Sequence, residues 1–468
     1  MEVIRKETIE RIHSDSFKDV FTLSPVRAGA IDGKTLVPSK YNIERRFSDD
    51  KTLIYNTASD SIVLLTEEEY CAVFKRKDDS SNYNDIIDAL VKSGMLVPNN
   101  ESEDLILGLI RQKQIIETGR ELKIAINTTY DCNARCSYCF ECESERKKMS
   151  PSVVEDVAEY LCRSVDADDF ITYRWFGGEP LIAADVIDRI IHKVNDHFNN
   201  RINYRSVILS NGTICNDSII RKILTDWRVE EFHVTIDGNR ELHNWKKHFL
   251  DSSFDGYGKL IQTIQILLNN GIRVVCRINV DKENIGMLEE IITDFEEIKN
   301  RQKFEIYVAP VRRHTPEVES ICFDYEEYEK VFQKTFRVLF EHGLLHSIDQ
   351  IVPKRKITCC STRASNELVV DTEGRLFKCM QTATDDQHTI GSCQTGLEYN
   401  EELSKWLFPK EYEECKDCIY MPICQGGCKG FRSLNNPLIS PCVIEKYYMD
   451  VILDYTRKIY EREKHDNN

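Results

Sequence analysis

The middle of the chain alternates between short apolar runs and longer amphipathic segments. Apolar runs typical of buried strands occupy residues 122–129, 171–176, 204–210, 230–236, 273–280 and 304–310. Helical periodicity predicts helices at about 152–165, 183–198, 216–226, 256–269, 284–299 and 325–341. Strand–helix units repeated in this way predict a partial (βα)6 barrel built on a parallel sheet. The active site of such a fold lies at the carboxyl ends of the strands.

A smaller α/β pattern precedes the barrel pattern, from about residue 40 to residue 98. A capping box, formed by Thr66 and by Glu69 three residues later, predicts the start of a helix. The other predicted elements are strands at 51–57 and 61–66, a second helix at 84–94 and a strand at 95–97. The turn-forming residues Pro98, Asn99 and Asn100 mark a boundary. We therefore expect an N-terminal region at 1–100.

The last third of the chain is rich in loop-forming residues up to about Cys442, and it then becomes amphipathic. Residues 443–463 predict a terminal helix. We therefore divide the rest of the chain into a linker helix at 101–121, the barrel at 122–345, and a cysteine-rich domain with the terminal helix at 346–468.

Composition and charge narrow the class of protein. The 468 residues include 62 Lys and Arg against 78 Asp and Glu, which gives a net charge of −16. A protein that binds nucleic acid needs a basic face, so the balance argues against that class. The chain contains no apolar run long enough to span a membrane, and its first twelve residues lack the apolar stretch of a signal peptide. We therefore expect a cytoplasmic protein without a membrane or nucleic-acid partner.

Eighteen cysteines in a chain without an export signal suggest metal binding or redox chemistry rather than disulfides. Cys132, Cys136 and Cys139 form a CxxxCxxC motif directly after the first barrel strand. Three close thiolates suit a cubane iron–sulfur cluster, in which the fourth iron stays open to a substrate or cofactor. A zinc site with Cys142 as the fourth ligand is the alternative.

Polar motifs follow the later barrel strands, where they would converge on one face. They are Gly177, Gly178 and Glu179 after the second strand, Ser210 and Asn211 after the third, Asp237 after the fourth, and Arg277 and Asn279 on the fifth. Each motif alone is also an ordinary turn signal. Their convergence beside the cysteine loop favours a binding site.

The CxxxCxxC loop, with Tyr138 before its last cysteine, and the later GGEP motif resemble the radical S-adenosylmethionine (SAM) enzymes. This resemblance implies a [4Fe–4S] cluster on Cys132, Cys136 and Cys139, which binds SAM and cleaves it to a 5′-deoxyadenosyl radical. It further implies that Tyr138 lies near adenine, that Gly177, Gly178 and Glu179 hold the methionine amine, and that Ser210 and Asn211 hold the ribose. Asp237 and His243 match a further family motif, whereas Asn244 and Lys247 depart from it.

The second cysteine group has the spacing CxxCx5CxxxC, at Cys415, Cys418, Cys424 and Cys428. On spacing alone, structural zinc and iron–sulfur sites are equally compatible with it. The order of the cysteines resembles the SPASM domain, which binds two auxiliary [4Fe–4S] clusters. The resemblance implies one cluster on Cys360, Cys379 and Cys428, with Cys359, Cys393 or an open site in the fourth position. The other cluster would use Cys415, Cys418, Cys424 and Cys442.

The N-terminal unit resembles the winged helix-turn-helix domain with which peptide-modifying relatives bind a leader peptide, although it can also be a simple packing extension. Together, the resemblances imply a maturase of a ribosomally synthesised precursor peptide that forms a cross-link, foremost a Cys thioether. A low-potential flavodoxin- or ferredoxin-type reductant would supply electrons. Epimerisation or a carbon–carbon bond is an alternative outcome. A sulfatase-type maturase that makes formylglycine and a non-enzymatic metal or electron carrier are the rival functions.

Overall fold

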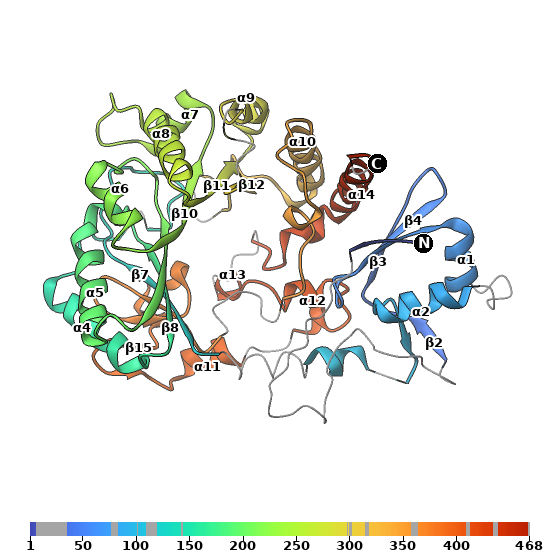
Figure 1. Cartoon of the computed structure of the whole chain (residues 1–468), viewed down its shortest axis with the longest axis horizontal. Coiled ribbons are helices and arrows are strands. Elements are labelled where there is room, and N and C mark those ends of the chain that lie inside the picture. Colours follow the sequence, from blue (N-terminus) through green and yellow to red (C-terminus); the bar gives the residue numbers. More distant parts are fainter. Residues whose placement is uncertain are drawn as a thin grey trace.

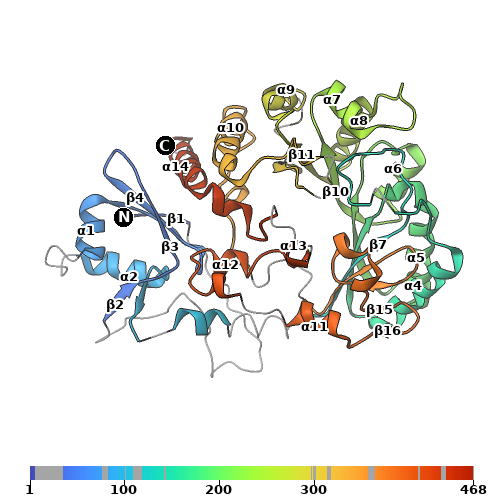
Figure 2. The ribbon, with the colours of Figure 1, turned by 180° about the vertical axis from the view of Figure 1, so that it is seen from behind.

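The computed structural model describes residues 1–5, 35–75, 83–100, 102–108, 119–141, 144–296, 298, 302–313, 318–356, 364–408, 412–433 and 439–466. Three parts follow one another across the molecule (Figures 1 and 2). The strand–helix repeats form one end, the N-terminal unit forms the other, and the last part of the chain, residues 412–466, lies between them. Among the described helices, none combines the length and the apolar character that crossing a membrane requires.

The central sheet contains the six predicted parallel strands in sequence order, which confirms the α/β prediction. They are β7 (Glu121–Asn127), β8 (Phe170–Phe176), β9 (Asn203–Leu209), β10 (Val229–Ile236), β11 (Arg273–Val280) and β12 (Phe304–Pro310). Two strands that the sequence pattern did not predict extend the sheet beyond β7. They are β13 (Glu367–Val370), parallel to β7, and β14 (Leu376–Phe377), antiparallel to β13. Strands this short carry too few residues to show periodicity.

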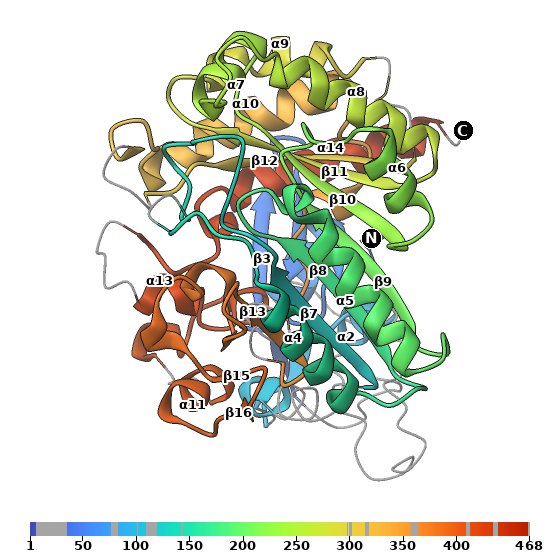
Figure 3. The same cartoon turned by 90° about the vertical axis from the view of Figure 1, so that its left-hand side faces the viewer.

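The helices between the strands lie along the outer side of the sheet (Figure 3). They are α4 (Pro151–Ser164), α5 (Ala184–His197), α6 (Asp217–Leu224), α7 (Arg240–Lys247), α8 (Gly256–Asn269), α9 (Leu288–Thr293) and α10 (Tyr328–Glu341). Side-chain N-caps at Ser150, Asn216 and Asn239 accept hydrogen bonds from the first turns of α4, α6 and α7. Sequence periodicity missed α7, because the residues that this helix buries are His243, Lys246 and Lys247 rather than apolar ones.

The N-terminal unit contains a four-stranded antiparallel sheet in the order β1-β5-β4-β3. Its strands are β1 (Glu2–Arg5), β3 (Asn42–Arg46), β4 (Lys51–Asn56) and β5 (Ile62–Thr66), and a separate pair joins β2 (Leu36–Pro38) to β6 (Leu96–Pro98). Helices α1 (Glu67–Phe74) and α2 (Asn84–Lys92) complete the unit. Thr66 and Glu69 form the predicted capping box at α1. Of the predicted linker helix, the structure describes helical backbone at 103–108, and residues 109–118 lie outside the described ranges.

The C-terminal third consists of short elements and one long helix. The short elements include β15 (Gly391–Ser392), β16 (Gly396–Leu397), α11 (Glu401–Leu407), α12 (Met421–Cys424) and α13 (Lys429–Ser433), and the long helix is α14 (Met449–Asp466). Tyr448, just before α14, stacks on Phe332 of α10 with ring centroids 3.6 Å apart. On the other side, Arg45 of β3 pairs with Asp454 of α14 at 2.8 Å. Helix α14 therefore ties the N-terminal sheet to the barrel.

Candidate active site

The three cysteines of the first motif lie in the loop after β7, and this loop is fastened to α7. The backbone N–H of Arg135 donates to the carbonyl of Lys247 at 2.8 Å, and the Cys136 thiol lies 3.8 Å from the same oxygen. Burial raises the pKa of the Cys132 thiol to about 11 and that of Cys139 to about 12. The neighbouring thiols of Cys136 and Cys132 add to the rise of the Cys139 pKa. Cys142, the fourth ligand of the zinc alternative, lies outside the described residues.

The GGE segment after β8 runs directly against the cysteine loop. The N–H of Gly178 donates to the carbonyl of Thr129, and the N–H of Glu179 donates to that of Asp131, both at 2.8 Å. A Cβ atom on Gly177 would lie 2.3 Å from the Thr129 carbonyl oxygen, and one on Gly178 would lie 2.3 Å from that of Asp131. Both contacts are far inside van der Waals distance. The two glycines are therefore required by the approach of the cysteine loop itself.

Glu179 joins three of the predicted residues into one polar cluster. Its side chain is fully buried, and it accepts hydrogen bonds from the Ser210 hydroxyl at 2.9 Å and from the Asn211 N–H at 2.8 Å. Burial raises the pKa of Glu179 to about 7, although these donors oppose the rise. The Asn211 amide also lies 3.9 Å from the Cys132 sulfur. A cation placed here would restore the charge of the carboxylate.

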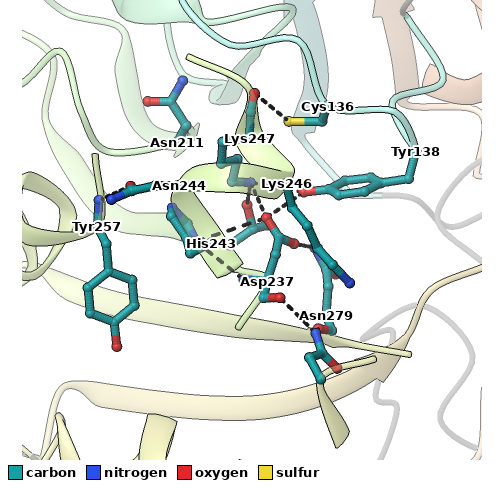
Figure 4. Close-up of polar contacts among 12 residues, drawn as sticks. Cys136, Tyr138, Asn211, Asp237, His243, Asn244, Lys246, Lys247, Tyr257 and Asn279 are labelled. Atoms are coloured by element: carbon teal, nitrogen blue, oxygen red, sulfur yellow. Dashed lines mark hydrogen bonds and ion pairs between the residues drawn. The ribbon is translucent and has the colours of Figure 1, made fainter. Parts of the chain in front are cut away.

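Asp237, at the end of β10, is the centre of a second buried network (Figure 4). Its carboxylate accepts hydrogen bonds from the Tyr138 hydroxyl and from the Asn279 amide, both at 2.7 Å, and it pairs with Lys247 at 2.9 Å. Burial raises the pKa of Asp237, but the charge of Lys247 and these donors outweigh burial and hold it at about 2. The carboxylate is therefore ionised at neutral pH.

Lys247 is the residue that sequence reasoning left without a role. Its ammonium donates to the Tyr138 hydroxyl at 3.0 Å and to the Thr235 hydroxyl at 2.8 Å, in addition to its pair with Asp237. Asn244, the other departure from the family motif, instead accepts a hydrogen bond from the N–H of Tyr257 at the start of α8. The only sequence signal for Lys247 was its position in the Asp-Gly-to-His segment.

The predicted residue His243 lies behind Asp237 rather than in an open site. Its Nδ1 accepts a hydrogen bond from the N–H of Asp237 at 3.3 Å, and the ring is fully buried. Burial and the charge of Lys247 lower the pKa of His243 to about 3. The imidazole is therefore neutral and supports the backbone at the end of β10.

One cavity of about 880 Å³ connects this site to the second cysteine region. Its lining includes Tyr138 and Cys139 of the cysteine loop. It also includes cysteines of the C-terminal third, namely Cys379, Cys424, Cys428 and Cys442. Arg277 lines the cavity two residues before Asn279 on β11, with Tyr307 opposite it on β12. The barrel and the C-terminal third therefore enclose a common space.

The C-terminal cysteines fall into two groups. A Cβ atom on Gly430 would lie 3.8 Å from the sulfur atoms of both Cys379 and Cys428. In the second group, burial raises the pKa of Cys424, and the thiols of Cys442, Cys415 and Cys418 add to the rise. Cys359 and Cys360 lie outside the described residues. Within the described ranges, no three His, Cys, Asp or Glu side chains are close enough to hold a single metal ion.

Residues 126–295 match the family model of the radical SAM superfamily. This span covers the cysteine loop, the GGE segment and the Asp237 network. The barrel is a radical SAM domain. The chain is accordingly an enzyme, and its family implies SAM and a [4Fe–4S] cluster.

Two curated relatives resemble this chain over most of their own length. The cysteine-type anaerobic sulfatase-maturating enzyme of Clostridium novyi is 24% identical over 338 residues, which covers 66% of this chain and 87% of that protein. The radical SAM cyclopropyl synthase TigE of Paramaledivibacter caminithermalis is 20% identical over 428 residues, which covers 82% and 84%. Among solved structures, native anSMEcpe with bound AdoMet and Cp18Cys peptide superposes with a TM-score of 0.55 at 17% identity. That match covers 72% of this chain and 99% of the other, and it supports the fold.

Proposed function

We propose that this radical SAM enzyme modifies a ribosomally synthesised precursor peptide and joins a cysteine sulfur of the peptide to carbon in a thioether. The observation that carries the proposal is the cavity that runs from Cys139 to Cys379, Cys424, Cys428 and Cys442. A peptide segment placed there would lie between the two cysteine regions. The relatives are named for chemistry on a protein or as peptide-bound structures, which agrees with a peptide substrate.

The residues of the barrel fit the cofactors that the family implies. Cys132, Cys136 and Cys139 supply three half-buried thiols, and iron ligation would keep them deprotonated where burial alone favours the neutral thiol. When bound, the cluster and SAM supply a 5′-deoxyadenosyl radical for hydrogen abstraction. The buried carboxyl of Glu179, with Gly177 and Gly178, would hold the methionine amine of SAM.

The other predicted contacts surround this point. Ser210 and Asn211 orient Glu179 and would hold the ribose, while Tyr138, fixed by Asp237 and Lys247, would lie near adenine. Asn279 fixes the opposite oxygen of Asp237. Arg277 is not part of these hydrogen-bond networks among the described residues, since it faces the cavity. The network would therefore position the cofactor, and the cavity would admit the peptide.

The C-terminal third would be a SPASM domain with two auxiliary [4Fe–4S] clusters. The proximity of Cys379 to Cys428 supports one cluster, to which Cys360 would contribute, with Cys359 or an open site in the fourth position. The other cluster is supported by the effect of neighbouring thiols on cysteine pKa values. The pKa of Cys424 is raised by the thiols of Cys415, Cys418 and Cys442, and two of these also raise the pKa of Cys415. Electrons for the three clusters would come from a flavodoxin- or ferredoxin-type reductant.

The N-terminal unit would bind the leader of the precursor peptide. Strand β3 is one of the two edge strands of its sheet, and an edge strand offers unpaired backbone groups to an extended peptide. The match to TigE covers 82% of the chain and so includes part of the region before the barrel. The winged-helix assignment rests on this sheet with α1 and α2 packed against it.

The experiment starts with iron, acid-labile sulfide and zinc analysis of anaerobically purified protein. About 12 iron and 12 sulfide per chain are expected for three [4Fe–4S] clusters. Replacing Cys132, Cys136 and Cys139 together by Ala should abolish 5′-deoxyadenosine formation while auxiliary iron remains bound. Persistent SAM cleavage in that variant would contradict the radical assignment. Zinc with little sulfide in the wild type would contradict the cluster assignment altogether.

The second candidate function is formylglycine formation on a protein cysteine, because the Clostridium novyi relative is named for sulfatase maturation. Mass spectrometry of the modified peptide distinguishes the thioether product from the formylglycine product. A thioether keeps the sulfur and loses a pair of hydrogen atoms, whereas formylglycine replaces the thiol sulfur of Cys by a carbonyl oxygen. Formylglycine as the product would overturn the thioether proposal.

A further inference from the structure

The cavity between the barrel and the C-terminal third carries a charge opposite to that of the whole chain. Its described lining contains six Lys and Arg side chains and two Glu side chains, a formal charge of +4. The chain as a whole has a net charge of −16. Basic groups are therefore concentrated in this cavity despite the acidic composition.

Basic side chains elsewhere in the enzyme commonly pair with carboxylates. Arg45 contacts Asp454 at 2.8 Å, for example, and Arg375 contacts Asp371 at 2.6 Å. Lys123, within the cavity, pairs with Glu367 at 3.4 Å. In each of these pairs the carboxylate compensates the charge of the cation.

Four cations of the cavity have no carboxylate partner within ion-pair distance among the residues that the structure describes. They are Arg174, Arg277, Arg312 and Lys356. The Nε atom of Arg277 is fully buried and has no hydrogen-bond partner in the described structure. The guanidinium of Arg312 lies over the ring of Phe431, 4.6 Å from its centroid. All four side chains are half-buried. A cation that is partly removed from water and has no counter-ion is unfavourable, so a bound anion would stabilise this arrangement.

The four cations come from separate parts of the fold and face one space. Arg174 lies on β8 and Arg277 on β11, so both belong to the barrel. Arg312 follows β12, and Lys356 lies between α10 and β13, toward the C-terminal third. Guanidinium groups bind carboxylates through paired N–H donors. Groups on two strands and in two loops can hold more than one carboxylate, whereas SAM carries only one carboxylate.

We propose that this cavity binds carboxylates of the peptide, so that acidic residues flank the residue that the enzyme modifies. The inference rests on the proposed function and adds the class of peptide sequence. Arg174 and Arg312 would contact Asp or Glu side chains, and Lys356 would add a further charge at the C-terminal side of the cavity. The substrate class is therefore an acidic peptide segment around a cysteine.

Two labelled synthetic peptides, Gly-Asp-Asp-Cys-Asp-Asp-Gly and its Asn counterpart, test the proposal with reconstituted full-length enzyme and SAM. Fluorescence anisotropy gives the affinity of each peptide, and separate assays give SAM affinity and SAM cleavage. The Asp peptide should bind at least about 10-fold more tightly than the Asn peptide. Each of three single variants should weaken binding of the Asp peptide about 10-fold and leave the affinity for the Asn peptide unchanged. The variants are Arg174→Gln, Arg312→Gln and Lys356→Gln. Arg189→Gln, on the outer helix α5, is the matched control and should keep the preference.

Iron content and thermal unfolding identify any variant that fails to fold. The variants that do fold then show whether the cavity binds carboxylates of the peptide. Equal affinity for the two peptides, or a preference that all folded cavity variants retain, would overturn the inference while SAM cleavage leaves the proposed function standing. Weaker SAM binding with an unchanged peptide preference would assign the cations to SAM and also overturn it. Absence of binding by both peptides would overturn it as well. A wild-type enzyme with intact clusters that does not cleave SAM would instead contradict the proposed function.

Discussion

Replacing Lys247 by Met tests whether the Asp237 network holds the cofactor site together. Met keeps most of the length of the side chain but removes the ammonium. Lys247 is 3% exposed and Asp237 is 1% exposed, so water cannot replace the lost charge. The variant would also remove the donors to the hydroxyls of Tyr138 and Thr235. We therefore expect Tyr138 to lose its fixed position beside the cysteine loop.

The size of the effect follows from the geometry of the pair. At an effective dielectric constant of about 20, charges 2.9 Å apart attract by roughly 6 kcal/mol before desolvation is counted. Removing one partner of a buried pair typically costs about 3–5 kcal/mol, because the other charge stays buried. Without Lys247, burial would dominate and raise the pKa of Asp237 above its present value of about 2. Lys247→Met should therefore lower the free energy of unfolding by about 3 kcal/mol and weaken SAM binding at least about 10-fold.

Lys246→Met is the matched control for this variant. Lys246 is the neighbouring buried lysine of α7, and it pairs with Asp281 and with Glu283 rather than with Asp237. Urea denaturation should show a similar loss of unfolding free energy in both variants. Equilibrium titration should show weaker SAM binding only in Lys247→Met. Lys247→Arg should restore binding, since it restores the charge. Equal SAM affinity in the two Met variants, or an additive double cycle between Lys247→Met and Asp237→Asn, would refute the reasoning.

Three further predictions concern the surrounding residues. Because burial raises the pKa of Glu179 to about 7 from its ordinary 4.5, SAM-free enzyme should lose up to about 3 kcal/mol of stability as the pH rises from about 4.5 through about 7. Denaturation across this range should show a flatter slope for Glu179→Gln, and an identical slope would contradict the shift. Gly177→Ala should cost at least about 2 kcal/mol and reduce bound iron, because its Cβ would meet the Thr129 carbonyl, whereas Gly286→Ala meets nothing and should be neutral in the same melts. Cys393→Ala should keep the full iron content, since Cys393 is buried outside the cavity lining, and a loss of iron would make it a ligand.

The local pattern of the sequence determined the strands and most helices of the barrel. Each strand from β7 to β12 carries its own apolar run, and each of these runs is long enough to show its period. The capping box at Thr66 was equally readable, because both of its hydrogen bonds join residues three apart. The cysteine loop and the GGE segment could be named for the same reason, since their residues are contiguous.

The tertiary structure alone decided what these motifs contact. The hydrophobic pattern did not predict helix α7, because this helix buries charged side chains. Their burial requires the carboxylates of Asp237 and Asp281, which lie outside the helix and are brought to it by the fold. The glycines of the GGE segment proved to face the cysteine loop because parallel strands β7 and β8 lie side by side. The addition of β13 to the sheet and the gathering of cations around the cavity likewise depend on how the C-terminal third packs against the barrel. Charge compensation and close packing join residues far apart along the chain, and a linear pattern does not encode those distances.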